Sequence, residues 1–287
     1  MDYEIPLLAA VDRGSGWMSF RFGIPEGYSF KAGQFAMWRL GEGLMKPFTI
    51  SNSPTEGGFL EFTTKMSGSD YKKRLSALRP GDKVRLSQPL GKFTYLGQKK
   101  MAFLAGGVGI TPFRSIIRYL SDTGADCDVI LVWGVRSMDE AVFRDEFESL
   151  QSSVYSPQST VFSPQSSVLM KTEDRRRKTE DGRPKTEDRG PETADRRPQT
   201  GDRGPGTEDF QNGRRLKTVY VPTNPPAGWA GRSGFIDVAC IAEEVPDYAG
   251  RVFYVCGPPK MVEAMTKVLS ELGITGERLV VEQFSGY

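Results

Sequence analysis

The sequence predicts a two-domain protein, with an N-terminal antiparallel β-barrel over residues 1–98 and a C-terminal α/β domain with a parallel sheet over residues 99–287. Before Gln98, short stretches alternate apolar with polar residues and are separated by turn clusters. After Lys99, apolar strands alternate with helical patterns. A low-complexity repeat at about residues 150–214 interrupts the second domain.

The first domain reads as several short strands at regular spacing, which favours a closed barrel. Strands are expected at residues 17–22, 34–38 and 58–63, turns at 25–27 and 79–82, and one helix at 71–78.

The second domain reads as β-α-β units, which predict a parallel sheet covered by helices. Strands are expected at residues 101–105, 129–133, 252–255 and 279–281, and helices after Pro112, from about 138 to 150 and from 259 to 272.

The interrupting segment consists of seven-residue units that start at Ser149 and continue as degenerate copies to about Asp209. A seven-residue period suits a coiled coil, but these units lack an apolar a/d pair and many contain proline. Mixed charge and low apolar content predict a disordered insertion, with an interaction tail as the alternative. Deletion of residues 156–206 is therefore expected to leave activity within a few-fold of that of the full chain, because the entropy cost of closing a surface loop grows only slowly with its length.

The stretch that joins the first strand of the second domain to its helix is rich in glycine: Gly106-Gly107-Val108-Gly109-Ile110-Thr111-Pro112. Glycines let a backbone approach a phosphate, and the free N–H groups of a first helical turn point at it. The spacing differs from G-x-G-x-x-G, so an ordinary βα turn is the alternative.

Composition excludes several classes of protein. The net charge of +2 gives no indication of nucleic-acid binding, and no apolar run reaches the length of a membrane span. The three cysteines are far apart and the N-terminus has no signal-peptide layout, which together favour the cytoplasm. The chain has no histidine, which removes Ser-His-Asp catalysis and most zinc sites, and no metal site is expected. Hydride transfer on a bound cofactor remains compatible.

Four stretches occur in a defined order: Lys46-Pro47-Phe48-Thr49, Ser67-Gly68-Ser69-Asp70-Tyr71, the glycine stretch, and Cys256-Gly257-Pro258-Pro259 with the terminal Glu282-Gln283-Phe284. Together they resemble the ferredoxin–NADP reductase type of flavoprotein. The resemblance covers nearly everything outside the insertion, and it is the combination that makes it specific.

In that family the first stretch reads Arg-x-Tyr-Ser/Thr. The resemblance implies that Lys46 holds a flavin phosphate, that Phe48 stacks on the isoalloxazine beside Pro47, and that the Thr49 hydroxyl faces the reactive N5 edge. Lysine lacks the bidentate fork of arginine, and phenylalanine lacks the tyrosine hydroxyl. The alternative is a plain strand with a buried phenylalanine.

The second stretch opens the barrel helix, where Ser67 or Ser69 is a natural N-cap. The resemblance implies that Ser67, Gly68 and Ser69 bind the flavin pyrophosphate. The alternative is an N-cap without a ligand.

For the third stretch, the resemblance assigns Gly106, Gly107, Gly109, Thr111 and Pro112 to nicotinamide dinucleotide binding. Replacing Gly109 with valine is expected to abolish nucleotide reduction with flavin still bound, because the side chain would fill the phosphate approach. Arg136, after the next strand, either meets an adenosine 2′-phosphate or is a solvated loop arginine.

The fourth stretch implies that Cys256 borders the nicotinamide beside Gly257 and Pro258, and that Glu282 lies near the reacting edge. Core filler is the alternative for the cysteine. A C-terminal aromatic covers the flavin in the family, and here either Phe284 or Tyr287 takes that place.

The resemblance thus implies an NAD(P)H-dependent flavoprotein reductase that binds FAD rather than FMN and uses NADPH or NADH. Thr49, Cys256, Glu282 and Phe284 are the expected catalytic residues. The electron acceptor would be separate: a ferredoxin- or flavodoxin-like protein, a partner subunit or a small molecule. The alternatives are an electron-transfer subunit of an oxygenase- or hydrogenase-type complex and a redox-inactive nucleotide-binding or sensing module.

Overall fold

The computed structural model describes residues 2–155 and 215–284, with the side chains of 153–155 excepted. These two ranges belong to one unit of the chain. Most of the predicted insertion, and Tyr287, lie outside the described residues.

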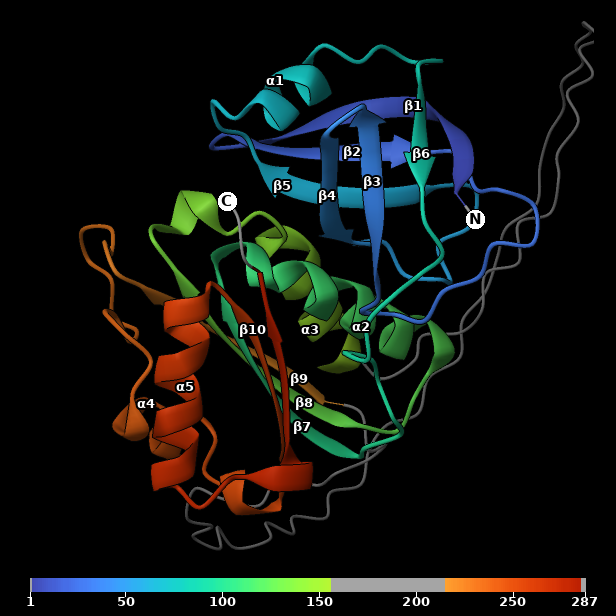
Figure 1. The fold of residues 1–287 in the computed structure, drawn as a ribbon. Helices are drawn as coiled ribbons and strands as arrows, with labels where there is room; N and C mark the ends of the chain where they lie inside the picture. The colour runs from blue at the N-terminus through green and yellow to red at the C-terminus, as the bar shows by residue number, and fades with distance from the viewer. Residues whose placement is uncertain (1, 156–214, 285–287) are drawn as a thin grey trace, which may run out of the picture. The chain divides into compact units, whose positions relative to one another are not determined.

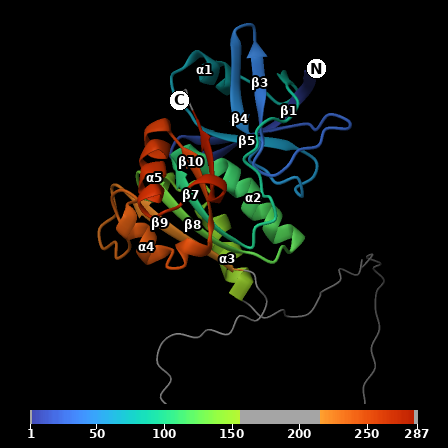
Figure 2. The ribbon, with the colours of Figure 1, turned by 60° about the horizontal axis from the view of Figure 1, so that its bottom comes forward.

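The N-terminal part is a six-stranded antiparallel sheet with the order β4-β3-β6-β1-β2-β5. Its strands are β1 (Tyr3–Gly14), β2 (Trp17–Phe22), β3 (Phe35–Gly41), β4 (Leu44–Thr49), β5 (Leu60–Lys65) and β6 (Lys83–Leu86). The chain segment after the edge strand β4 reaches the other edge, because the Ser51 amide donates to the Glu61 carbonyl of β5 at 2.7 Å. The predicted antiparallel barrel is confirmed, and α1 (Asp70–Ser76) packs against β3 and β4 (Figure 2).

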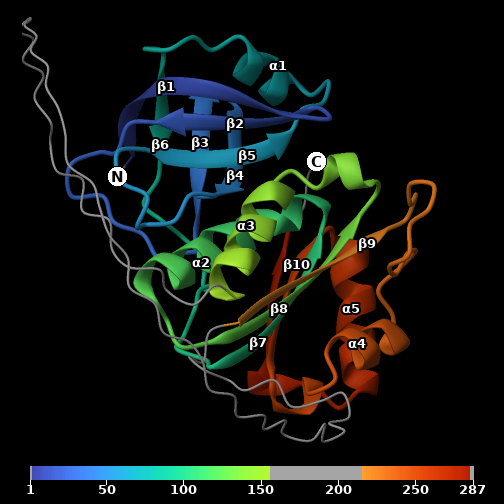
Figure 3. The same cartoon turned by 180° about the vertical axis from the view of Figure 1, so that it is seen from behind.

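The C-terminal part is a five-stranded parallel sheet with the order β11-β10-β7-β8-β9. Its strands are β7 (Lys100–Gly106), β8 (Asp128–Val135), β9 (Arg215–Pro222), β10 (Val252–Gly257) and β11 (Leu279–Gln283). Its helices are α2 (Ile110–Thr123), α3 (Arg144–Tyr155), α4 (Val238–Glu244) and α5 (Pro259–Glu271). Figures 1 and 3, seen from opposite sides, show α4 and α5 on one face and α2 and α3 on the other.

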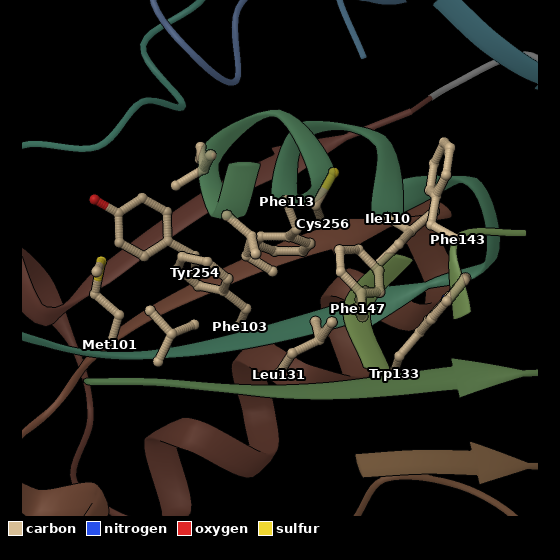
Figure 4. Packing of buried hydrophobic residues seen from close by; sticks show 14 of the residues in the cluster. Met101, Phe103, Ile110, Phe113, Leu131, Trp133, Phe143, Phe147, Tyr254 and Cys256 are labelled. Atoms are coloured by element: carbon tan, nitrogen blue, oxygen red, sulfur yellow. The ribbon is translucent and has the colours of Figure 1, made fainter. Parts of the chain in front are cut away.

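Three apolar clusters hold these layers together. One fills the barrel around Trp38 and Phe62. The other two cover the two faces of the parallel sheet, whose central strand β7 is buried on both sides as its apolar sequence predicts. Figure 4 shows the face toward α2, where Phe103, Phe113 and Tyr254 pack together.

The structure differs from the predicted elements in several places, and strands β1 and β6 of the barrel are among the elements that were not predicted. The predicted helix at 138–150 is divided into a short 3₁₀ turn (Met138–Glu140) and α3, which continues to Tyr155. Strand β9 and helix α4 were not predicted, and β9 forms an edge of the parallel sheet.

Within the described ranges, no helix has both the length and the apolar composition needed to cross a bilayer.

Candidate functional site

A cavity lies where the end of β4, the start of α1 and strand β11 meet. It is lined by Phe35, Lys46, Pro47, Phe48, Ser69, Tyr71, Lys72, Glu282, Gln283 and Phe284. It therefore brings predicted residues from the barrel together with predicted residues from the last described segment of the chain.

Phe48 forms one wall of the cavity and also belongs to the barrel core. Its ring stacks on the Phe62 ring, with 4.5 Å between the ring centroids and 13° between the ring planes. The centroid of the Tyr71 ring lies 5.5 Å from that of Phe48. Phe48 is thus a core aromatic that borders the cavity.

Two lysines supply positive charge to the cavity. Lys46 is exposed, whereas Lys72 is buried and its ammonium donates to the Lys65 carbonyl. Burial, and then the charge of Lys46, lower the pKa of Lys72. Two ammonium groups near each other make a favourable place for an anion.

Lys72 was missed by the sequence analysis. The signal that points to it is its place on α1, between Tyr71 and Leu75 on the buried side of the helix. A lysine on such a side is rarely buried without a reason.

Two buried polar atoms near the cavity have no hydrogen-bond partner among the described residues. They are Oγ1 of Thr49, the residue after Phe48, and Oε2 of Glu282. Burial raises the pKa of Glu282 from 4.5 to about 7. Because buried polar groups are normally paired, these two atoms are suited to a polar ligand.

The loop that opens α1 is exposed at Ser67, Gly68 and Ser69. Ser69 is the N-cap residue, as predicted, but its hydroxyl makes no capping bond. The helix therefore does not use this hydroxyl, which borders the cavity.

Gly109 lies directly against strand β10. A Cβ atom placed on Gly109 would lie 2.1 Å from the Cys256 carbonyl oxygen and 2.7 Å from the Gly257 nitrogen. The glycine is therefore required for packing of the turn on β10, a role that the sequence analysis did not assign to it, and the phosphate approach stays a prediction.

The neighbouring glycines have different surroundings. Gly106 and Gly257 face each other beside the Met261 sulfur, which a Cβ on either residue would meet at 2.9 or 2.8 Å. Gly107 has a φ of +50° and open space around its Cβ position. Of these glycines, Gly107 is the one whose backbone a ligand can approach.

The remaining nucleotide-binding candidates surround the carboxyl edge of the sheet. Thr111 and Pro112 are buried in the first turn of α2, and the Thr111 hydroxyl donates to the Val108 carbonyl at 3.1 Å. Arg136 is exposed at the end of β8, and no bond joins its guanidinium to another described residue. Its carbonyl accepts from the Asn224 amide, which ties together the loops after β8 and β9.

Cys256 lies opposite Glu282 in the pairing of β10 with β11 and is fully buried in the cluster of Figure 4. Burial, and then the Glu282 charge, raise the pKa of its thiol well above the ordinary value. The thiol is therefore protonated and packs as an apolar side chain. Pro258 follows on the surface as the N-cap of α5.

The C-terminal aromatic Phe284 is buried, and its amide donates to the Gly257 carbonyl at 3.1 Å. This bond ties the cavity wall to the end of β10. Tyr287, the other aromatic considered, lies outside the described residues.

Comparison with known proteins agrees with this arrangement. The family model described as the oxidoreductase FAD-binding domain matches residues 6–95, and the oxidoreductase NAD-binding domain matches residues 103–187 and 207–267.

Among curated relatives, one subunit of the Na(+)-translocating NADH-quinone reductase of Pseudomonas aeruginosa is 25% identical over 92% of this chain and 56% of its own length. The reductase component of glycine betaine monooxygenase of the same species is 34% identical over 44% of this chain and 37% of its own length. The chain thus spans about half the length of the first of these relatives.

Among solved structures, a ferredoxin NADP+ reductase from Neisseria gonorrhoeae with bound FAD and NADP covers 98% of both chains, with a TM-score of 0.68 and 17% identity. This likeness concerns the fold.

The two domain models, one matched on the barrel and the other on the parallel sheet, define a two-domain FAD- and NAD-binding oxidoreductase. The chain belongs to the ferredoxin–NADP reductase type of flavoprotein oxidoreductase, with FAD-binding and NAD-binding domains. The family predicted from the four stretches is confirmed.

Proposed function

We propose that this chain transfers a hydride between NAD(P)H and bound FAD and passes the electrons to a separate acceptor. The observation that carries the proposal is the cavity that joins Lys46 and Phe48 of the barrel to Glu282 and Phe284 of the C-terminal segment. In the proposed division, residues 1–98 bind the flavin and residues 99–287 bind the nucleotide, with the insertion at about 150–214.

The residues around the cavity suit a flavin. When bound, FAD supplies the two-electron chemistry that no side chain of this chain provides. The ammonium groups of Lys46 and Lys72 would hold phosphate, with Ser67, Gly68 and Ser69 beside them. Phe48 and Pro47 would support the ring, and the partnerless Thr49 hydroxyl would donate to it.

On the other side of the site, the sheet domain would orient the nucleotide. Gly107 presents an approachable backbone, and Gly106, Gly109, Thr111 and Pro112 shape the turn that carries it. Gly257, Pro258 and Arg136 complete the proposed nucleotide site.

Cys256 and Glu282 belong to the reaction zone as we propose it. The fully buried, protonated Cys256 excludes water from the end of β10. Glu282, with a pKa of about 7, can hold a proton at Oε2 at neutral pH. Phe284 covers the cavity until the nucleotide arrives.

The acceptor is proposed to be a protein, because each of the two curated relatives named above is one subunit of a larger enzyme. A role as the electron-transfer subunit of such a complex is the second candidate, and the names of both relatives as subunits favour it. We place the protein in the cytoplasm and propose no nucleic acid as its partner and no membrane-spanning segment.

The test is an anaerobic titration of the purified chain with FAD, followed by NADH or NADPH. The flavin absorbance should appear on binding and bleach on addition of one of the two nucleotides. Protein that binds no FAD, or binds it and is bleached by neither nucleotide, would count against the proposal.

A pair of lysine variants makes the flavin test specific. Lys72→Met removes the buried cation and should weaken FAD binding about tenfold, the effect of roughly 1.4 kcal/mol of charge-assisted hydrogen bonding. Lys73→Met, on the exposed side of the same helix, should bind FAD as the parent does. Equal FAD affinity of the two variants would exclude Lys72 from the site.

A further inference from the structure

A buried arginine connects the two domains beside the proposed reaction zone. The Arg114 side chain, on α2, is 7% exposed. Its guanidinium binds Glu56 bidentately, with Nη1 to Oε2 at 2.6 Å and Nη2 to Oε1 at 2.9 Å. Its Nε donates to Oε2 of Glu146 on α3 at 3.0 Å. One buried cation thus holds carboxylates from the barrel and from the sheet domain.

The same guanidinium contacts the backbone that follows strand β4. Nη1 of Arg114 donates to the Ser51 carbonyl at 3.0 Å, two residues after Thr49. Next along α2, the buried Ser115 hydroxyl donates to the Asn52 carbonyl at 2.7 Å. Helix α2 is therefore bonded to the segment that directly follows β4.

Both ends of this connection carry residues of the proposed site. The glycine turn leads directly into α2, and Thr111 is three residues before Arg114. Thr49 ends β4, two residues before Ser51. A displacement of α2 relative to Ser51 would change the distance between the nucleotide turn and Thr49.

The geometry at Arg114 requires the fork of a guanidinium. Five N–H donors serve two carboxylates and a carbonyl, and the Phe143 ring lies 5.6 Å from the guanidinium carbon. A lysine retains the charge but has a single nitrogen, so it cannot hold all three partners in this arrangement.

We propose that Arg114 is a positioning residue that sets the distance between the flavin and nucleotide sites, and so controls hydride transfer. This inference rests on the proposed function. Hydride transfer depends strongly on the separation of the reacting atoms, and a misplacement of about 1 Å costs about a hundredfold in rate.

The kinetic test compares Arg114→Lys with Arg118→Lys. Arg118 lies one turn further along α2 and pairs with Asp122 of the same helix. Lysine keeps the charge for this single pair and leaves the bond from Thr55 to Asp122 in place, so Arg118→Lys is the matched control. In stopped-flow mixing at saturating nucleotide, flavin reduction in R114K should be ten- to a hundredfold slower, with FAD and nucleotide affinities changed less than threefold. R118K should match the parent.

A second variant protects the test against a folding defect in R114K. Ser115→Ala removes only the bond to the Asn52 carbonyl and should slow flavin reduction several-fold. Without flavin, hydrogen exchange of residues 50–57 should be at least tenfold faster in R114K than in R118K, because the Ser51 and Glu56 contacts are lost.

The outcomes separate this inference from the function on which it rests. Parent protein whose flavin is not reduced overturns both. Parent flavin that is reduced, with R114K and S115A reducing theirs at the parent rate, overturns the positioning role alone. Unchanged exchange of residues 50–57 in R114K also counts against the positioning role.

Discussion

Glu282 shows how burial changes the chemistry of a single residue. Its Oε2 has no partner among the described residues, and burial raises its pKa from 4.5 to about 7. A carboxyl with a raised pKa in the folded state stabilises the fold through its protonated form. That contribution is complete below about pH 4.5 and is lost as the pH rises through about 7.

Glu282→Gln should therefore flatten the pH dependence of stability. Between pH 5 and pH 8, the unfolding free energy of the parent should fall relative to that of the variant by about 1–2 kcal/mol, a value reduced for partial exposure. Urea unfolding across this range, without added flavin, measures it. Glu263→Gln, at an exposed position of α5, is the control. Parallel curves for the parent and Glu282→Gln would contradict the prediction.

At the residue scale, the four stretches led to residues that lie together, since Lys46, Phe48 and Glu282 line one cavity, and their roles stay predictions. Residues that matter through burial alone were not found in this way. Lys72 was not predicted as a site residue because its burial depends on how α1 packs on β3 and β4. No local pattern encodes that packing.

At the scale of elements, the glycine turn between β7 and α2 depends on contact with β10. A side chain at Gly109 would meet the Cys256 carbonyl at 2.1 Å, a distance that only movement of backbone can relieve. Gly107 has open space, so a side chain there meets only the strain of its positive φ.

Gly109→Ala should therefore destabilise the protein more than Gly107→Ala does. We expect a loss of about 3 kcal/mol or more for Gly109→Ala from overpacking, and about 1–2 kcal/mol for Gly107→Ala from the left-handed backbone. Urea unfolding of both variants measures the difference. Equal losses would mean that the turn is not pressed against β10.

The division of the predicted helix at 138–150 has a tertiary cause. Ala141 leaves helical geometry, with φ −80° and ψ 72°, and Phe143 is buried. The centroid of the Phe143 ring lies 5.9 Å from the guanidinium carbon of Arg13 and 5.6 Å from that of Arg114, and both arginines are far from it in the chain. The helical pattern of residues 138–150 gives no information about these distant partners.

Strand β9 was missed because it is an edge strand of mixed burial that directly follows the repeat.

At the scale of the whole molecule, the fold class was predictable because alternation of period two changes to β-α-β at one point in the chain. The contacts between the two domains were not predictable. They join loop residues such as Thr55 and Glu56 to helix residues such as Asp122 and Arg114, and polar residues in loops and helices carry no pairing signal.

These contacts predict that the barrel and the parallel sheet unfold together. The buried Arg114–Glu56 pair joins the two domains, and removal of the arginine would leave a buried carboxylate without its counter-charge, at a cost of about 3–5 kcal/mol. The hydroxyl of Thr55 adds a bond to Asp122 at 2.6 Å, and Lys65 pairs with Glu140 at 2.7 Å. Separation of the domains would therefore break all of these contacts at once.

Buried tryptophans in both domains make this prediction measurable. Trp38 reports on the barrel and Trp133 on the parallel sheet. With Trp17 and Trp229 also replaced by phenylalanine, Trp38→Phe and Trp133→Phe each leave a single tryptophan. The fluorescence transition of each variant in urea should then coincide with its far-UV circular dichroism transition, because each domain loses its structure with the other. Adding Arg114→Gln to either variant should separate its fluorescence midpoint from its circular dichroism midpoint. The carboxylates of Glu56 and Glu146 then lack their counter-charge, which favours separation of the domains. Separate transitions in the parent background would show that the barrel and the sheet are independently stable and that the interdomain contacts contribute little.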